Sequence, residues 1–333
     1  MVLSTLRSPE QDGASIRIPL TTLTPLFTGG IGQYGEQVHP SGLLGSIRYF
    51  SCLVAAAVGD REFINKVWGS TGDQHAHAKQ VAFRWELDGL QKVNLPSSIT
   101  LKRDDGKNSK WFFTCAQQGN LVLVLTKRGI TDTHWNLLLI ALRIQIRWAS
   151  FGAKDQFGLG VLGCEQLPIV QALKPIQSAI NQCPGLQRSF FTRISFTVSA
   201  PLNSEQCLKA GLQWRQFLRG QFRKSDECMD EKKLRHYLFG NIEGRDRYGS
   251  AINISAAYLV DNNSYELRIW GAIPHTTIFP FNRQYTAIME CLTKAIDNAP
   301  PEFKGISKRL VEFSPNTEAM IPWINQLAGV NHD

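Results

Sequence analysis

RWASFGAKDQFGLGV, the sequence of residues 147–161, contains the features from which the rest of the chain can be interpreted. Its start continues a helical pattern, and Gly152 stands where that helix is expected to end. Lys154 follows in a polar loop, and Gly158 and Gly160 lead into an apolar strand. Glycine is required where φ is positive or where another backbone comes close. One interpretation is a loop whose N–H groups and lysine hold a nucleotide phosphodiester. The other is a helix C-cap followed by a β-bulge, with purely structural glycines.

The size and composition of the chain predict a folded protein of two domains. Its 333 residues exceed one typical domain of about 150 residues, and a hydrophobic fraction of 43% is ample for burial. No apolar run approaches the roughly 20 residues of a membrane-spanning helix, and the first residues lack the pattern of a secretory signal. Seven cysteines without regular spacing fit free thiols in a reducing compartment. We therefore expect a cytoplasmic protein that contacts no membrane.

The charge of the chain favours a polyanionic partner. The net charge is +8, with 17 basic and 13 acidic residues up to residue 166 and 19 and 15 after it, so each half carries +4. A positive excess shared by both halves is what two related nucleic-acid-binding domains would show.

Hydrophobic periodicity predicts the same order of elements in both halves. In the first half we expect strands at 16–23, 79–87, 111–115 and 121–126, helices from Pro40 to about 58 and at 133–151, and a last strand at 159–165, with a hairpin turn at 118–120. This is the βαββαβ plan of a ferredoxin-like or RRM-like domain. The second half restarts it with a strand at 190–199, helices at 205–224 and 231–239, strands at 250–260 and 265–271, and a helix at 283–299.

The halves also share landmarks. Arg48 precedes Gly69 by 21 residues, Arg219 precedes Gly240 by 21 residues, and the offset between halves is 171 in both cases. A degenerate internal duplication explains this spacing. We predict an α+β fold of tandem ferredoxin-like domains, at 1–166 and 189–333, joined by a proline-containing linker at 167–188. No second glycine loop is evident, and the tail beyond residue 307 shows only some helical content.

Four motifs together resemble the RAMP superfamily. They are TPLFTGG at 24–30, GSIRYF at 45–50, WGS at 68–70, and the glycine loop that begins GAK at 152 and ends GLG at 160. Within the superfamily the chain is most similar to the two-domain, first-numbered subunits of the type III-B Cmr CRISPR effector complex. The resemblance covers 16–163 well and 189–275 weakly. It implies RAMP-type tandem domains that contact CRISPR RNA and target RNA near the 3′ end of the guide, together with neighbouring RAMP subunits in antiviral defence, without catalysis, cofactor or metal.

The chain departs from the family pattern at three places. Leu44 stands where the family usually has the first arginine of its helix motif, and Tyr49 and Phe50 replace paired tryptophans. Asp155 and Gln156 occupy loop positions that are usually basic. These differences predict weaker guide contact by the loop or a divergent type III branch.

Basic residues elsewhere extend the predicted RNA-binding set. The arginines at 215, 219 and 223 recur once per turn of one helix, so they either follow successive phosphates or form a solvated helix face. The GRDRYG sequence at 244–249 suits a single strand, or is an ordinary loop, and Arg48 could instead be a buried ion-pair partner. We predict RNA contacts from Gly29, Gly30, Arg48, Arg147, Gly152, Lys154, Gly158, Gly160, Arg215, Arg219, Arg223, Arg245 and Arg247.

Three alternatives remain open. His39 lies between the first strand and the first helix, where it could act as general base or acid in metal-independent processing of CRISPR RNA. Asp104 or Asp105 could cut target RNA, or could form a salt-bridged hairpin tip. His75 and His77 are a weak metal signal because no cysteine is nearby. A free-standing RRM regulator would need exposed aromatic residues on its sheet, and the predicted strands lack that pattern.

Overall fold

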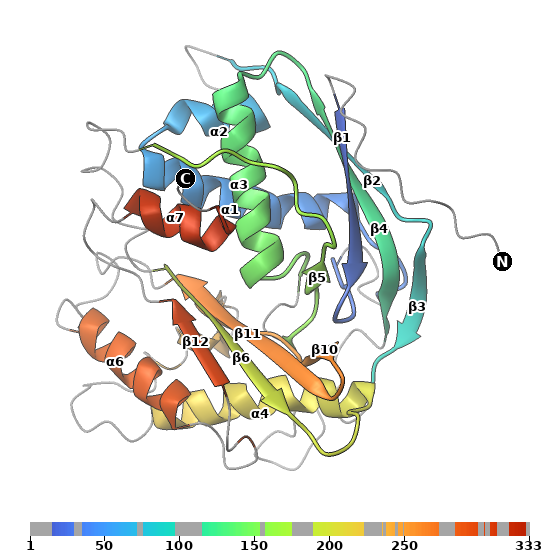
Figure 1. Cartoon of the computed structure of the whole chain (residues 1–333), viewed down its shortest axis with the longest axis vertical. Helices are drawn as coiled ribbons and strands as arrows, with labels where there is room; N and C mark the ends of the chain where they lie inside the picture. Colours follow the sequence, from blue (N-terminus) through green and yellow to red (C-terminus); the bar gives the residue numbers. More distant parts are fainter. Residues whose placement is uncertain are drawn as a thin grey trace.

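Two antiparallel sheets, one from each half of the chain, form the frame of the computed structural model (Figure 1). The structure describes residues 15–29, 35–71, 76–96, 115–153, 157–174, 189–222, 235, 238–243, 246–248, 250–272, 284–298, 303, 307–311 and 320–330. The predicted α+β class is therefore confirmed, and the two sheets account for the predicted repetition.

The first sheet has the strand order β2-β4-β1-β5, and β3 pairs with the first half of β4. Its strands are β1 (Ser15–Thr22), β2 (Val81–Glu86), β3 (Leu90–Asn94), β4 (Cys115–Lys127) and β5 (Leu162–Gly163). In β1, buried Ile18 and Leu20 alternate with exposed Arg17 and Pro19, which fixes the face that the helices cover. The first and third strands of the plan lie in the centre, as a ferredoxin-like domain requires.

Four helices form a layer over this sheet: α1 (Pro40–Val58), α2 (Arg61–Trp68), α3 (Asp132–Trp148) and α7 (Met320–Ala328) (Figure 1). The helix α3 is apolar almost all round because α1, α2 and α7 pack on it besides the sheet. The indole Nε1 of Trp148 donates to the carbonyl of Leu327, 2.8 Å away, and the Arg143 Nε donates to Ala328 at 2.7 Å. The last described helix of the chain therefore completes the core of the first domain.

The helix α1 is, among the helices that the structure describes, the one long and apolar enough to cross a membrane. Eight of its residues are buried, and its apolar face belongs to the same core as α3. Its composition is thus that of a core helix.

The second sheet repeats the topology of the first. Its order is β10-β11-β6-β12, with β9 paired to β11. The strands are β6 (Ser189–Thr197), β9 (Ile252–Ile254), β10 (Tyr258–Asp261), β11 (Ser264–Ala272) and β12 (Ser307–Val311). The helices α4 (Ser204–Gln221) and α6 (Gln284–Asp297) cover the side away from the first domain (Figure 1). A separate hairpin is formed by β7 (Asn241–Glu243) and β8 (Asp246–Tyr248).

The structure corrects several predicted boundaries. The hairpin turn at 118–120 is wrong, because β4 continues through it and β3, which was not predicted, pairs there. Gly119, with φ of +136°, allows this because a Cβ on it would lie 2.2 Å from the carbonyl oxygen of Gly89. The predicted strand at 250–260 is divided into β9 and β10, and the last strand of the first half spans only 162–163. Residues 111–114 lie outside the described part.

The start of the predicted linker is fixed to the first domain. The backbone N–H of Gln171 donates to Asn136 of α3, and that of Leu173 donates to Asn325 of α7, both at 2.8–2.9 Å. Residues 175–188 are not among those described.

Candidate nucleic-acid interface

The TPLFTG segment at 24–29 lies between the start of α1 and the glycine loop. The N–H of Ala153 donates to the carbonyl of Phe27 at 2.7 Å, and the N–H of Gly160 donates to that of Pro25 at 2.9 Å. On the other side, the N–H of His39 donates to the hydroxyl of Thr28 at 2.7 Å. Three segments therefore form one junction, and the glycine loop among them lies more than 100 residues after the other two. Thr28 is the member that sequence reasoning missed as an individual residue.

The start of α1 is suited to an anion. His39 is the N-cap residue in an extended conformation, but its side chain makes no capping hydrogen bond, and the first turn holds no acidic residue. Pro40 brings no N–H to this turn, and the N–H of Gly42 donates to the carbonyl of His39 at 3.0 Å. The attraction for an anion therefore comes from the helix dipole, which places partial positive charge there. Gly42 lets the TPLFTG segment approach, since a Cβ on it would lie 2.8 Å from the Thr28 carbonyl oxygen. Gly29, with φ of +71°, turns the segment at this point.

The outer face of α1 continues the junction. Gly45, Arg48, Tyr49 and Cys52 are exposed along it, and Arg48 forms no ion pair with any residue the structure describes. The interpretation of Arg48 as a buried ion-pair partner is therefore wrong. The ring of Tyr49 is 45% exposed. Arg48 lies about 12 Å along the helix from Pro40 at 1.5 Å per residue, so a cation and an aromatic ring stand within a nucleotide or two of the helix start, a combination suited to a single strand.

The glycines of the loop are required by the protein's own backbone. A Cβ on Gly152 would lie 2.5 Å from the Phe27 oxygen, one on Gly160 2.0 Å from the Phe151 oxygen, and one on Gly158 2.2 Å from the Ala256 nitrogen. All three have φ between +83° and +88°. The structural interpretation of these glycines is thus sufficient to explain them, and the bare backbone is not open space left for a phosphate. Lys154 lies outside the described residues, so RNA contact by this loop stays a prediction.

Three of the other predicted arginines are described, and each of them is half-buried. Arg147 is half-buried at the end of α3 against Gly329, whose added Cβ would lie 2.3 Å from its Nη1. Arg215 donates to the carbonyl of Phe239, and its guanidinium lies 5.9 Å from the ring centre of Phe157. Arg219, half-buried, lies one turn further along α4 in the second domain.

Other predicted positions fall outside what the structure describes: Gly30, Arg223, Arg245, and the side chain of Arg247, whose backbone is part of β8. Their RNA contacts stay predictions.

The outward face of the first sheet is charged. Arg17 of β1 and Arg84 of β2 both pair with Glu86, with an Arg84 Nη2 to Glu86 Oε1 distance of 3.0 Å. The hydrogen bond from Arg17 holds the pKa of the Glu86 carboxyl below its usual value. The aromatic residues of β2, Phe83 and Trp85, pack inward against Trp68 and Phe151. The described strands of this sheet therefore offer no outward stacking platform of the kind that an RRM regulator uses.

Features that favour catalysis are sparse. His39 is half-buried at the junction, and His77 pairs through its backbone with Ser70. Within the described ranges, no group of three or more histidine, cysteine or acidic side chains could hold a metal ion. Asp104, Asp105 and His75 are outside those ranges. The five described cysteines form no disulfide.

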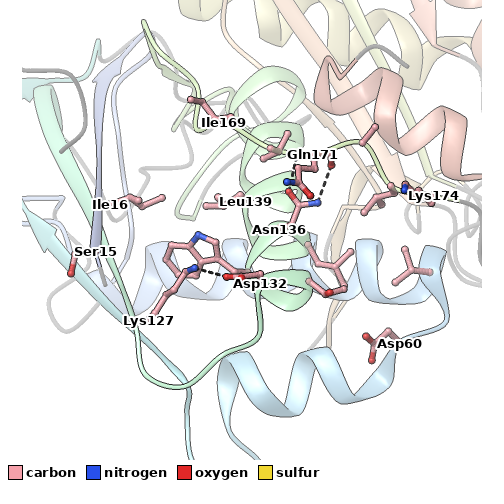
Figure 2. A pocket seen from close by; sticks show the side chains of 17 residues that line it. Ser15, Ile16, Asp60, Lys127, Asp132, Asn136, Leu139, Ile169, Gln171 and Lys174 are labelled. Carbon is pink, nitrogen blue, oxygen red and sulfur yellow. Dashed lines mark hydrogen bonds and ion pairs between the residues drawn. The ribbon is translucent and has the colours of Figure 1, made fainter. Parts of the chain in front are cut away.

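A cavity of about 610 Å³ lies between α3, the start of β1 and residues 169–174 (Figure 2). Lys127 and Asp132 on its wall pair with each other at 2.7 Å, and Asn136 donates to the carbonyl of Gln171 at 2.9 Å. None of the predicted RNA-binding residues lines it, so it is separate from the junction.

Comparison with known proteins agrees with the motif analysis. Residues 19–163 match the model of the RAMP superfamily. A chain of the type III-B Cmr-beta complex bound to cognate target RNA and AMPPnP has a similar fold, with a TM-score of 0.54 and 11% identity over 85% of this chain and 99% of that one. Cmr1 from Pyrococcus furiosus in its apo form gives a TM-score of 0.48 and 13% identity over 88% and 97%. No curated protein matches the chain by sequence.

Proposed function

We propose that this chain, a RAMP superfamily protein through residues 19–163, is a non-catalytic RNA-binding subunit of a type III, Cmr-like CRISPR effector ribonucleoprotein. In this role it contacts CRISPR RNA and target RNA near the 3′ end of the guide and packs against neighbouring RAMP subunits during antiviral defence in the cytoplasm. The Cmr-beta complex, one chain of which has a similar fold, is bound to cognate target RNA, and this supports the choice of partner.

The observation that carries this proposal is the junction of the TPLFTG segment, the start of α1 and the glycine loop. The junction presents a helix start without a side-chain cap, followed by Arg48 and Tyr49 on an exposed helix face. Lys154 is two residues beyond Gly152 in the sequence and adds a further cation to the same loop. A phosphate at the helix start and a base against Tyr49 would use all of these groups without any catalytic side chain.

Binding led by phosphates should depend on salt and little on sequence. We expect Arg48→Ala, Lys154→Ala and Arg219→Ala each to weaken binding of all single-stranded RNAs similarly and to flatten the salt slope by about one unit. The measurement is fluorescence anisotropy of labelled CRISPR RNA across a salt series. Arg84→Ala is the matched control, since Arg84 is an exposed arginine that already pairs with Glu86 on the sheet face. A slope for Arg48→Ala equal to that of the parent would remove Arg48 from the phosphate contacts.

The second candidate function is a CRISPR-RNA-processing endoribonuclease that uses His39. The position of His39 at the junction favours it, because an RNA held at the helix start would pass this side chain. Incubation with labelled repeat RNA without metal separates the two functions. Cleavage that His39→Ala abolishes would overturn the non-catalytic role; the variant keeps the backbone N–H that Thr28 accepts, so the turn itself is retained.

A further inference from the structure

A buried arginine of the second domain closes the end of α3, where the glycine loop begins. Arg268 of β11 is 4% exposed. Its Nη1 donates to the carbonyls of Ile146 and Ala149 at 2.7 and 2.9 Å, and its Nε donates to the hydroxyl of Tyr258 at 2.8 Å. The last carbonyls of a helix lack partners and carry partial negative charge. A guanidinium there satisfies the helix end and fixes its direction.

A second arginine reinforces this contact. Arg193 stands opposite Arg268 in the β6–β11 pair. It donates to the carbonyl of Arg147, and its guanidinium lies 4.7 Å from the ring centre of Trp148. Glu266, 3.7 Å from Arg193, accepts a hydrogen bond from the Tyr258 hydroxyl. Two guanidiniums and one carboxylate therefore leave a net positive charge at the carboxyl end of α3, where the helix dipole is negative.

The far end of the loop is held by the second domain as well. The N–H of Ala256 donates to the carbonyl of Gly158 at 3.1 Å. Phe157 and Leu159 are buried in a small apolar cluster with side chains from both domains, including Phe27 and Leu208. Residues 255–257 are in turn fixed on α4. The N–H of Ala257 donates to the carbonyl of Cys207 at 3.0 Å, and a Cβ on Gly211 would lie 2.4 Å from the Ser255 oxygen.

We propose that the second domain is the template that holds the glycine loop of the first domain in its RNA-binding shape, with Arg268 as the main positioning residue. Of the described residues at 149–160, Arg268 hydrogen-bonds Ala149, so we infer that it acts through the end of α3. The inference rests on the proposed function only where it connects the shape of the loop to RNA binding. The shape itself can be measured separately.

The test uses the full chain with Arg268→Gln, Arg268→Lys and Ser255→Ala, and with Arg84→Gln as the charge-matched control. Amide hydrogen exchange is followed at Phe151, Ala153 and Gly160, whose N–H groups close the junction, and at β1 and β4 as an internal reference. We expect about tenfold faster exchange at the junction in Arg268→Gln, with no change in β1 and β4. Affinity for labelled single-stranded CRISPR RNA at fixed salt should fall by about five- to tenfold, against less than about twofold for the control.

The other variants keep the proposal falsifiable. Arg268→Lys retains the charge but not the divergent donors, so it should recover only part of the loss. Ser255→Ala removes a hydroxyl that accepts a hydrogen bond from the backbone N–H of Arg268 at 2.7 Å and donates one to the carbonyl of Ala256. It carries the test if Arg268→Gln does not fold, with an expected effect of about threefold on exchange.

Each outcome decides a different point. Unchanged exchange at the junction in every folded variant overturns the template, whatever the RNA affinity. Faster exchange with the affinity of the control overturns the link between loop shape and RNA binding. Failure of the parent chain to bind RNA at all would count against the proposed function, while the exchange data would still decide whether the second domain holds the loop.

Discussion

The two domains share one strand order but differ in the segment before their last strand, which follows α3 in the first domain and α6 in the second. In the first domain, the residues between α3 and β5 contain three glycines with positive φ, and Phe157 packs between the domains. In the second domain, the corresponding segment between α6 and β12 places Phe303 in that domain's own core, against Phe196 and Trp214 with ring centres 5.0 and 5.9 Å apart. Phe157 is therefore shared at the domain interface, whereas Phe303 packs within its own domain.

This comparison shows which feature the two halves have in common and in which feature they differ. Strand order depends on alternation and packing, which many sequences satisfy, so both halves keep it. The loop of the first domain depends on close backbone approaches to the second domain, such as that of Gly158 to Ala256. The second domain supplies the surface on which this loop rests. Four measurements test this comparison.

The largest effect is expected from Phe303→Ala. Truncation of a ring that is 7% exposed should lower the free energy of unfolding by roughly 3–5 kcal/mol, measured by urea denaturation. Hydrogen exchange should rise in β6 and α4 and stay unchanged in β1 and β4. Phe157→Ala, at an equally buried ring, should instead raise exchange on both sides of the interface. If the two variants show identical exchange patterns, the contrast between Phe303, packed within one domain, and Phe157, packed between the domains, does not hold.

Gly158→Ala tests the close approach to the second domain. The new Cβ would lie 2.2 Å from the Ala256 nitrogen at a φ of +83°, so we expect a loss of roughly 2–4 kcal/mol of unfolding free energy. Gly129→Ala is the matched control, because Gly129 has φ of +87° and nothing within 4 Å of an added Cβ. It should lose only about 1 kcal/mol, the cost of the left-handed backbone alone. Equal losses would mean that the contact with Ala256 is unimportant.

Tyr258 makes the interface sensitive to alkaline pH. Burial, with Glu266 nearby, raises the pKa of its phenol to about 12, although Arg268 and Arg193 act in the opposite direction. The folded state thus keeps the proton to a higher pH than the unfolded chain. Its stabilising effect is complete below about pH 10 and is lost as the pH rises towards 12, by up to about 2 kcal/mol. The difference in unfolding free energy between the parent and Tyr258→Phe, measured from pH 9 to 12, should shrink over that range. A constant difference would contradict the assignment.

The smallest effects on stability are expected from glycines in the first helix of each domain, α1 and α4. Gly45 in α1 and Gly220 in α4 both have open space around an added Cβ. Gly45→Ala should stabilise the chain by roughly 0.5–1 kcal/mol, and Gly220→Ala by less, since it lies in the last turn. Thermal unfolding measures both. If Gly45→Ala is more stable but binds RNA less well while Gly220→Ala binds normally, the bare surface of α1 is used by the RNA and that of α4 is not.

Hydrophobic periodicity was enough to predict most strands of the two sheets and the start of α1 at Pro40, and the spacing of the glycines predicted a glycine loop. It was not enough to predict what the glycines face, because Gly158 meets Ala256, which lies 98 residues further along the chain. Arg193 and Arg268 were missed because they occupy ordinary alternating positions of their strands. The alternation of Arg268 with the apolar Leu267 and Ile269 is also what a strand with one solvated face shows, so the sequence held no separate signal that Arg268 is buried.

The return of α7 to the first domain has a consequence for synthesis of the protein. Trp148 donates to the carbonyl of Leu327, and Arg143 donates to those of Ala328 and Gly329 as well as to that of Pro168. While the ribosome is still making the second domain, the apolar flank of α3 that later receives Met320–Ala328 has no cover. We therefore expect the first domain to complete its packing only after residues 320–328 have been synthesised.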